Sequence, residues 1–461
     1  MNCTFLKSSS FLYISLIFFH SCSPKDDIDL ININSESNFQ NFEENIGLSE
    51  FPSISVLTNG VEIVDDPKVN AEMIISENDI EKKYNIGIEI RGSSSQMFPK
   101  KSYGFETKNE DWTQDKDESI GGFPEEEDWI LYGPYSDKSL IRNKLTFDLS
   151  NLIGFKASNT KFYNLFIEYD FKGLYILMEK IKRDPNRVNI TEHTDGGLDG
   201  GYILKIDKST GDYNCGNCYD ESFSFRSKYD TSGSLSEQSQ IYFIYDYPKP
   251  EEISENQKNY IKSMIFDFET ALLTEDDNFI DNLIDINSFV DFMIINELTK
   301  NPDGFRLSTY MHKDLNGKIK MGPIWDFNLA FGNVDYCDGA NPQGWIHNFN
   351  DICPGDLWQV PFWWKSLMNR DIFISSLKSR WNQLRTSTLS ESSLNNLIDS
   401  YVNYLSTNKT VDQNFSKWPI LGQYIWPNYF VGSSYQEEIE FLKNWLNQRL
   451  DWMDNEISSI N

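Results

Sequence analysis

The chain has 461 residues and a formal net charge of −29, from 41 Lys and Arg against 70 Asp and Glu. An apolar fraction of 39%, with 15% aromatic residues, is enough for a sizeable core and excludes an acidic disordered chain. The acidity argues against nucleic acid as a partner and against unaided binding to an anionic membrane. We therefore expect a folded globular protein made of one large domain or two lobes.

The first residues have the pattern of a targeting segment. Lys7 precedes the apolar run "FLYISLIFF", and "HSC" follows, ending at Cys22. This predicts a lipoprotein signal peptide over residues 1–21 with a lipid on Cys22; an ordinary secretory signal is the alternative. Residues 22–48 are polar and acidic and predict a tether, whose first letters "SPKDD" resemble an outer-membrane export tag. We expect an exported lipoprotein facing outward from the outer membrane and held there by its lipid alone.

The first half of the remaining chain alternates apolar and polar residues. Such alternation predicts strands at "FPSISVLTNG", "YNIGIEIRG", "KSYGFET", "KFYNLFIEYD", "GLYILMEKI" and "GGYILKIDK". One helix is predicted at "SDKSLIRNKLTFDLSNLIG", with Ser136 or Asp137 as its cap.

After about residue 250, apolar residues recur at spacings of three and four, which is typical of helices. The segments are "SENQKNYIKSMIFDFETALL", "DINSFVDFMIINELTK", "FISSLKSRWNQLRTSTLSESSLNNLIDSYVNYL" and "YQEEIEFLKNWLNQRLDWMDNEI". We therefore predict an α+β fold with a strand-rich N-terminal lobe over residues 49–240 and a helix-rich C-terminal lobe over residues 241–461.

One hairpin is predicted inside the helical half. The runs from Leu307 to Lys313 and from Lys318 to Ile324 flank "DLNG", whose Asn-Gly pair favours a tight turn. A turn there places residue 307 opposite about residue 326. Asp303 and Asp326 would then meet at the open end of the hairpin.

Two carboxylates placed together repel each other unless a cation joins them. Asp326 also stands among large apolar residues in "GPIWDFNLAFGN", where an uncompensated charge is costly. We predict Mg²⁺ or Mn²⁺ on Asp326, with Asn328 or Asn301 as further ligands, and Asp303 orienting and deprotonating an attacking hydroxyl. The alternative is that both aspartates only shape local turns.

A second group of residues suits phosphate binding. In "RGSSSQMFPKKSY" a small-residue loop offers amides and hydroxyls to phosphate oxygens, with positive charge beside it. The candidates are Arg91, Ser93, Ser94, Ser95, Lys100 and Lys101. Glu179, in "GLYILMEKIKRDPNRV", would hold a phosphate-binding lysine, and Arg142 adds charge from the predicted helix. The alternative is a polar surface turn with solvated cations.

Other chemistries have little support. The chain has four His, one of them in the predicted signal, and it has neither a Walker loop nor a GxGxxG motif. Beyond the signal and Cys22, four cysteines remain, an even number that fits two disulfides in an exported protein. Local loop closure favours Cys215–Cys218 and Cys337–Cys353, and a four-cysteine zinc site is the alternative.

Taken together, the segments resemble the CotH kinase family of atypical kinases. The matching runs include "RGSSSQMFPKKSYGFE", "DWILYGPYSDKSLIRNKL", "GLYILMEKIKRDPNRVNI", "GGYILKIDK", "NPDGFRLSTYMHKDLNGKIKMGPIWDFNLAFGN" and "RWNQLR", covering about residues 50 to 450. The resemblance implies a two-lobed, kinase-like fold that uses ATP and Mg²⁺ to phosphorylate Ser or Thr of a protein outside the cytosol.

On the matching positions, Asp303 would be the catalytic residue and Asp326 the metal ligand, with Arg91 to Lys101 and Glu179 acting on phosphates. Many members carry a second Asp where this chain has Asn328. The competing hypothesis is a surface module without catalysis, an adhesin or a glycan- or protein-binding protein. Compartment favours that second hypothesis, because ATP is scarce outside a cell.

Overall fold

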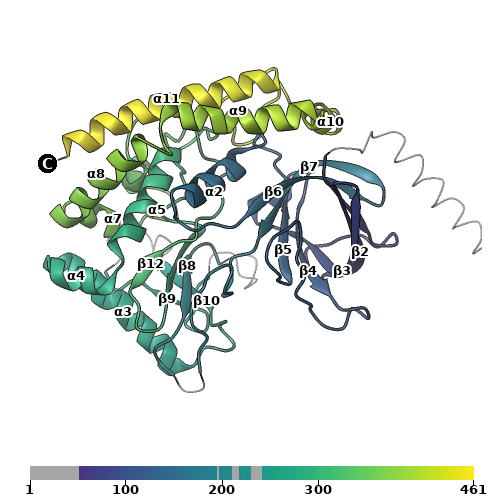
Figure 1. Ribbon diagram of the computed structural model, residues 1–461. Coiled ribbons are helices and arrows are strands. Elements are labelled where there is room, and N and C mark those ends of the chain that lie inside the picture. The colour runs from purple at the N-terminus through teal and green to yellow at the C-terminus, as the bar shows by residue number, and fades with distance from the viewer. Residues whose placement is uncertain (1–50, 195–196, 210–217, 230–240, 461) are drawn as a thin grey trace, which may run out of the picture. The chain divides into compact units, whose positions relative to one another are not determined.

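The fold is described here from a computed structural model, which defines residues 51–194, 197–209, 218–229 and 241–460. Residues 49–461 form one compact unit. The strand-rich first half and helix-rich second half confirm the predicted α+β class (Figure 1). The predicted signal, the tether and Cys22 lie outside the described residues.

Seven strands of the first half close into a barrel in the order β1-β2-β3-β4-β5-β7-β6. They are β1 (Ser53–Leu57), β2 (Val69–Glu77), β3 (Ile80–Arg91), β4 (Ser102–Lys108), β5 (Asp128–Tyr132), β6 (Thr160–Ile167) and β7 (Asp170–Glu179). Neighbouring strands are antiparallel except β1 and β6, whose parallel pairing closes the barrel. Because every strand has two neighbours, the barrel has no exposed edge.

A second sheet of five strands, in the order β12-β11-β8-β10-β9, combines segments from both halves of the chain. Its strands are β8 (Tyr202–Ile206), β9 (Ser224–Arg226), β10 (Tyr242–Tyr247), β11 (Thr309–Lys313) and β12 (Ile319–Met321). Strand β8 pairs antiparallel with β11, so that Ile206 lies opposite Thr309. The end of β8 is therefore beside the segment that leads into the predicted hairpin.

Helices make up most of the second half. They are α2 (Arg142–Leu152), α3 (Glu255–Thr274), α4 (Asp277–Leu283), α5 (Ile286–Thr299), α6 (Phe349–Ile352), α7 (Trp363–Leu367), α8 (Asp371–Arg385), α9 (Glu391–Thr407), α10 (Thr410–Lys417) and α11 (Tyr435–Ser459), with 3-10 turns η1 (Ser94–Met97) and η3 (Ile346–Asn348). Ser254 and Gln257 form a capping box that starts α3. Helix α2 begins later than predicted, at Arg142, but the Asp137 carboxylate still accepts that residue's N–H at 2.9 Å.

The hydrophobic core has two main parts. One fills the barrel, and a larger one lies between the five-stranded sheet and the helices. Trp363 and Trp364 are each 1% exposed and belong to the larger core. Within the described part of the chain, the helices are too short or too polar to cross a membrane.

Candidate active site

The predicted hairpin is present and brings the two aspartates to one end. Met311 lies opposite Met321 in β11 and β12, one residue from the predicted register. Asp303 precedes β11 and Asp326 follows β12. The Asn301 side-chain N–H donates to the backbone carbonyl of Asp326 at 3.1 Å, which ties the two segments together.

The sequence suggested that the Asp326 side chain is buried among its apolar neighbours, but the structure shows otherwise. Its side chain is exposed, while Ile324 and Phe327 are buried and Trp325 is half-buried. The reason is the left-handed backbone conformation of Asp326, which has φ of 62°. This conformation turns the Asp326 side chain away from the direction that a continued strand would give it. Asp is among the few residue types that adopt this conformation readily.

Asp326 nevertheless stands in an electrostatic environment that disfavours its charge. Surrounding protein atoms, then the carboxylates of Asp303 and Asp207, raise its pKa to about 6, while Arg91 and Lys208 act in the opposite direction. The neighbouring carboxylates therefore add to the effect of desolvation on this pKa. A divalent cation would relieve this repulsion.

The sequence interpretation missed Asp207. This residue directly follows β8, and its carboxylate accepts hydrogen bonds from the backbone N–H groups of Lys208, at 2.8 Å, and Ser308. Burial raises the pKa of Asp207. An acidic residue at the end of the apolar run "YILKI" was the available signal, but the pairing of β8 with β11 was not readable from the sequence.

Asp303 is half-buried and held by local contacts. Its carboxylate accepts a hydrogen bond from Arg306 at 2.7 Å, and its backbone carbonyl accepts from the N–H groups of Arg306 and Leu307. Asn301 is buried, and its side-chain oxygen accepts the Asp303 N–H at 3.3 Å. The predicted ligand Asn301 thus contacts both aspartate segments. Asn328 is half-buried two residues beyond Asp326, and its backbone carbonyl accepts from Asn333 at 2.8 Å.

The Gly-Ser loop approaches the same cluster through Arg91, the last residue of β3. The Arg91 guanidinium lies 5.8 Å from the centroid of the Trp325 ring, beside Asp326. Ser93 and Ser94 are exposed and Ser95 is half-buried, around the first turn of η1. Gly92 has φ of 110°, and a Cβ there would clash with the Ser95 hydroxyl. Glycine is therefore required for this tight loop.

Three other predicted phosphate ligands contact protein groups in the structure. Lys100 is buried, and its ammonium donates to Pro134 O at 3.2 Å and to Asn414 Oδ1 at 2.8 Å. Lys101 is half-buried and donates to the carbonyl of Gln96, next to the Gly-Ser loop. Arg142 is fully buried and pairs with Asp137 at 2.6 Å.

Two residues of helix α2 hydrogen-bond to the backbone of the segment that follows Asp326. The Arg142 Nε–H donates to Ala330 O at 3.0 Å, and the neighbouring Asn143 side-chain oxygen accepts the Phe327 N–H at 2.6 Å. The Phe147 ring packs edge-on against the Trp325 and Phe327 rings. Arg142 therefore acts on the loop rather than on the solvent side of the site.

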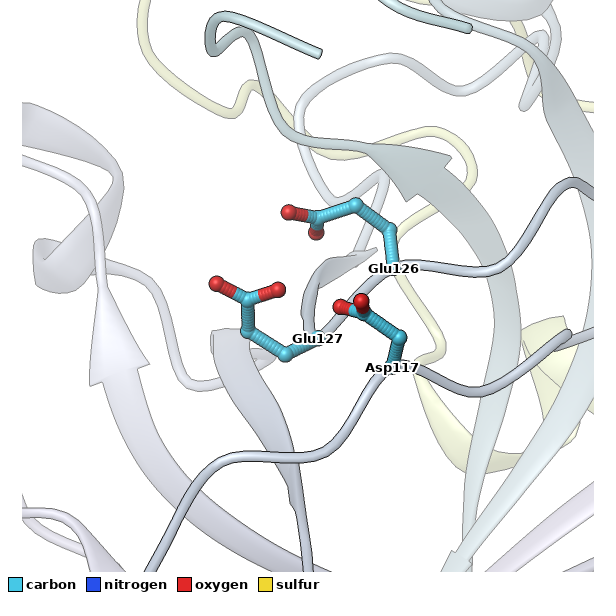
Figure 2. Close-up of side chains that lie close together, drawn as sticks. All are labelled: Asp117, Glu126 and Glu127. Carbon is cyan, nitrogen blue, oxygen red and sulfur yellow. The ribbon is translucent and has the colours of Figure 1, made fainter. Parts of the chain in front are cut away.

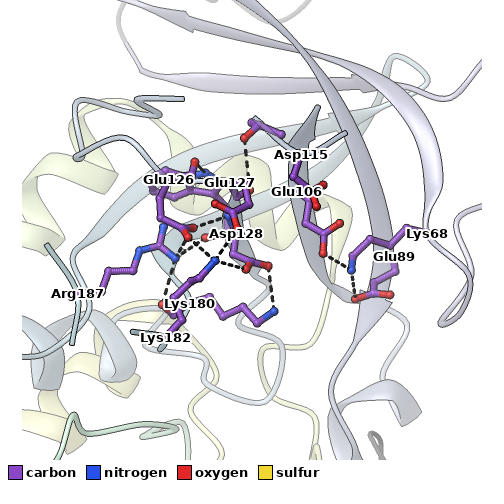
Figure 3. Close-up of polar contacts among 12 residues, drawn as sticks. Lys68, Glu89, Glu106, Asp115, Glu126, Glu127, Asp128, Lys180, Lys182 and Arg187 are labelled. Carbon is purple, nitrogen blue, oxygen red and sulfur yellow. Dashed lines mark hydrogen bonds and ion pairs between the residues drawn. The ribbon is translucent and has the colours of Figure 1, made fainter. Parts of the chain in front are cut away.

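Glu179 is buried at the end of β7. One carboxylate oxygen accepts the Asn159 N–H at 2.8 Å, and the other has no hydrogen-bond partner among the described residues. The cations that follow it pair with an acidic run instead (Figure 3): Lys180 with Asp128 at 2.9 Å, Lys182 with Glu126, Glu127 and Asp128, and Arg187 with Glu126 at 2.9 Å. Those lysines are thus already paired with carboxylates at the start of β5 and in the segment before it.

A separate acidic cluster is formed by Asp117, Glu126 and Glu127, whose carboxylate oxygens lie within 4.8 Å of one another (Figure 2). A hydrogen bond to Glu127 contributes most to raising the pKa of Asp117. Because Lys182 and Arg187 already contact this cluster, a metal would have to displace cations that the fold supplies. The hairpin end is the better candidate site.

The predicted Cys337–Cys353 disulfide is confirmed, with Cα atoms 5.6 Å apart. This pairing removes two ligands from the alternative zinc site. The other predicted pair includes Cys215, which lies outside the described residues.

A groove of about 700 Å³ runs between the segment around the disulfide and α11. Its lining is aromatic and acidic, with Tyr336, Tyr429 and Trp445 next to Asp335, Glu437 and Glu440. Tyr336, in this lining, has a hydroxyl whose pKa is raised by burial and then by the Asp303 carboxylate.

Comparison with known proteins gives one match. The family model described as CotH kinase protein matches residues 88–453, which include every described part of the candidate site. No curated protein matches the chain.

Proposed function

The chain belongs to the CotH kinase family, and from this premise we propose that it is an atypical protein kinase that transfers the γ-phosphoryl group of ATP to a Ser or Thr of a protein substrate. The observation that supports this most is the meeting of Asp303 and Asp326 at one hairpin end, where desolvation and then the carboxylates of Asp303 and Asp207 raise the pKa of Asp326. The proposed kinase-like fold has the barrel region as its N-terminal lobe and the helical region as its C-terminal lobe.

The donor set at the hairpin end suits Mg²⁺ or Mn²⁺. Both ions prefer carboxylate and amide oxygens, which are the groups that these residues offer. Asp326 would hold the metal, with Asn328 and Asn301 as further ligands. The bound metal would neutralise charge on the triphosphate.

The protein groups divide the remaining work. Asp303, oriented by Arg306, accepts the proton of the acceptor hydroxyl. Arg91 and the Ser93–Ser95 loop contact phosphate oxygens from the barrel side. Asn143 and Arg142 keep the Asp326 loop in place through its backbone, which is the preorganisation that phosphoryl transfer requires.

The groove favours a basic acceptor segment. Its exposed carboxylates, Glu437 and Glu440, would attract lysine or arginine side chains, and its rings would pack against them. A basic segment bound along the groove is therefore the proposed acceptor.

Calorimetry of the purified protein with ATP and Mg²⁺ or Mn²⁺ tests the proposal. Binding should require the metal, vanish in Asp326→Ala, and persist in Asp281→Ala, a control on an exposed aspartate in α4. Transfer of labelled γ-phosphate to a Ser-containing basic peptide should then be lost in Asp303→Ala. Absence of metal-dependent binding by the folded wild-type protein would refute the kinase proposal.

The second candidate is a binding module without catalysis, an adhesin or a glycan- or protein-binding protein. One observation favours it: Tyr424, Trp426 and Tyr429 are 54%, 43% and 61% exposed on one loop near the groove. Such neighbouring exposed rings are a feature of interaction surfaces. The calorimetric experiment separates the two, because a binding module has no need of ATP.

We also propose export and anchoring through Cys22, which places the active site outside the cytosol, on the surface of the outer membrane. The Cys337–Cys353 disulfide supports an oxidising compartment. Cys22→Ser should move the protein from the membrane fraction to the soluble fraction and abolish lipid labelling. Retention of both in that variant would contradict the anchor.

A further inference from the structure

Arg306 contacts the proposed catalytic residue Asp303, and its guanidinium forms several further hydrogen bonds. Its side chain is 3% exposed. The guanidinium donates to Asp303 Oδ1 at 2.7 Å, to Pro302 O at 2.8 Å and to Asp356 Oδ1 at 2.9 Å. It also lies 4.0 Å from the centroid of the Phe349 ring. These contacts hold the guanidinium in one orientation relative to the Asp303 carboxylate.

Asp356 is itself held by its own loop, "CPGDLWQ", over residues 353–359. Its Oδ1 accepts the Trp358 N–H at 2.9 Å, and its own N–H donates to Cys353 O at 3.1 Å. The Gln359 side chain donates to Asp356 O at 2.7 Å. Cys353 is the residue joined to Cys337, so the covalent crosslink ends three residues before Asp356.

The same loop reaches the other side of the carboxylate cluster. The Lys208 ammonium lies 4.9 Å from the centroid of the Trp358 ring. The Trp358 indole N–H donates to the Tyr219 hydroxyl at 3.3 Å, and that hydroxyl donates to Asp207 O at 2.7 Å. The loop therefore contacts the supports of both Asp303 and Asp207.

We propose that Arg306 and Asp356 are positioning residues for phosphoryl transfer: Asp356 fixes the Arg306 guanidinium, which fixes Asp303 Oδ1 and leaves Oδ2 to accept the proton of the acceptor hydroxyl. This inference rests on the proposed kinase function. The charge of Asp356 matters as well as its shape, because it helps to balance the charge of the buried Arg306 guanidinium. Without Asp356, Asp303 would be the remaining carboxylate paired with Arg306.

Asp356→Asn tests the pair with little change of shape, since the amide oxygen can still accept from Arg306. We expect kcat to fall about 10- to 100-fold, as small misplacements of a reacting group do. The KM for ATP and the Kd for the metal–nucleotide complex should stay within about twofold, because neither residue is proposed to touch the nucleotide. Arg306→Lys should retain more activity than Arg306→Met. Asp351→Asn is the matched control, an exposed aspartate within the disulfide loop that pairs with Lys365.

Amide hydrogen exchange gives a readout that is independent of catalysis. The N–H groups of Arg306 and Leu307, which donate to Asp303 O, should exchange faster in Asp356→Asn than in the wild type or Asp351→Asn. Unchanged exchange, or an unchanged kcat, would overturn the positioning role. Parallel loss of kcat, nucleotide affinity and thermal stability would also overturn it, since that pattern marks a residue needed only for folding. If the wild type bound no nucleotide, the proposed function would fail, and the exchange measurement would still decide whether Asp356 fixes the Asp303 segment.

Discussion

The side-chain oxygen of Asn143 accepts the backbone N–H of Phe327 at 2.6 Å, across 184 residues of sequence. Phe327 directly follows Asp326, so a residue in the second position of α2 sets where the proposed metal ligand begins its loop. Both groups are buried, and the strength of such a bond is greatest where water cannot replace it. The metal site is thus supported from an element outside the hairpin.

We expect Asn143→Ala to weaken metal-dependent ATP binding about tenfold and to lower the free energy of unfolding by about 1–3 kcal/mol, the cost of leaving a buried N–H unpaired. Calorimetry and urea unfolding measure the two effects. Asn151→Ala is the control, because Asn151 accepts a similar bond, at 2.8 Å from Ala157, at the other end of α2. Equal losses of ATP affinity in both variants would contradict a local role for Asn143.

Arg91 and Lys100 should behave differently, although the same short segment carries both. Arg91→Met should weaken ATP binding by about tenfold or more, because its charge lies beside Trp325 and Asp326. Lys100→Met should leave ATP affinity within about twofold, because burial lowers the pKa of Lys100 and its ammonium points to Pro134 and Asn414. Calorimetry on both variants decides, and a large loss of affinity in Lys100→Met would return that residue to the phosphate site.

The pKa of Asp326 predicts a pH-dependent stability in the metal-free protein. Because the folded state raises this pKa from 3.8 to about 6, the folded protein holds the proton more tightly than the unfolded chain. The contribution of Asp326 to stability therefore falls as pH rises from about 4 to 6 and is constant above that. Asp326→Asn lacks this loss, so without metal it should be more stable than the wild type above pH 6, by less than about 1 kcal/mol for an exposed group.

Urea unfolding of wild type and Asp326→Asn between pH 4 and 7 measures that difference. Added Mn²⁺ should reverse it, because only the wild type gains stability from bound metal. A difference that does not change with pH would mean that the folded protein does not raise the pKa of Asp326.

The sequence predicted local structure well where one segment contained the whole signal. The Asn-Gly turn and its flanking strands placed Asp303 and Asp326 together, with an error of one residue in register. The six predicted strand segments were confirmed for the same reason, as were the predicted helical segments, which form α3, α5, α8, α9 and α11. Hydrophobic periodicity is a signal within a short stretch of sequence, and the formation of these helices and strands depends mainly on that stretch.

Long-range pairing was not predictable from the same patterns. Asp207 joins the site only because β8 pairs with β11, and the barrel closes only because β1 pairs with β6. The burial of Lys100 and Arg142 also depends on distant partners, Asn414 and Ala330. A lysine or arginine beside a small-residue loop looks the same in sequence whether it faces solvent or the interior.

The groove predicts a charge effect on the acceptor. Glu440→Lys should raise the KM for a lysine-rich acceptor peptide several-fold, roughly 3- to 10-fold at low salt, and leave the KM for ATP unchanged. Added salt should reduce the difference, because an exposed charge is screened. Asp451→Lys makes the same change of charge on the exposed side of α11, outside the groove lining. Equal effects of the two substitutions would indicate overall charge rather than the groove.

Removing the disulfide should affect both stability and transfer. The crosslink joins residues 16 apart, for which loop closure accounts for about 3 kcal/mol of stability. Replacing Cys337 and Cys353 by Ser should therefore lower the free energy of unfolding by about that amount, measured by urea unfolding with and without a reductant. The wild type should lose stability in the reductant and the variant should not. Because Asp356 follows Cys353 closely, kcat should fall further than ATP affinity. A variant that loses stability but keeps its full kcat would show that the loop holds Asp356 in place without the crosslink.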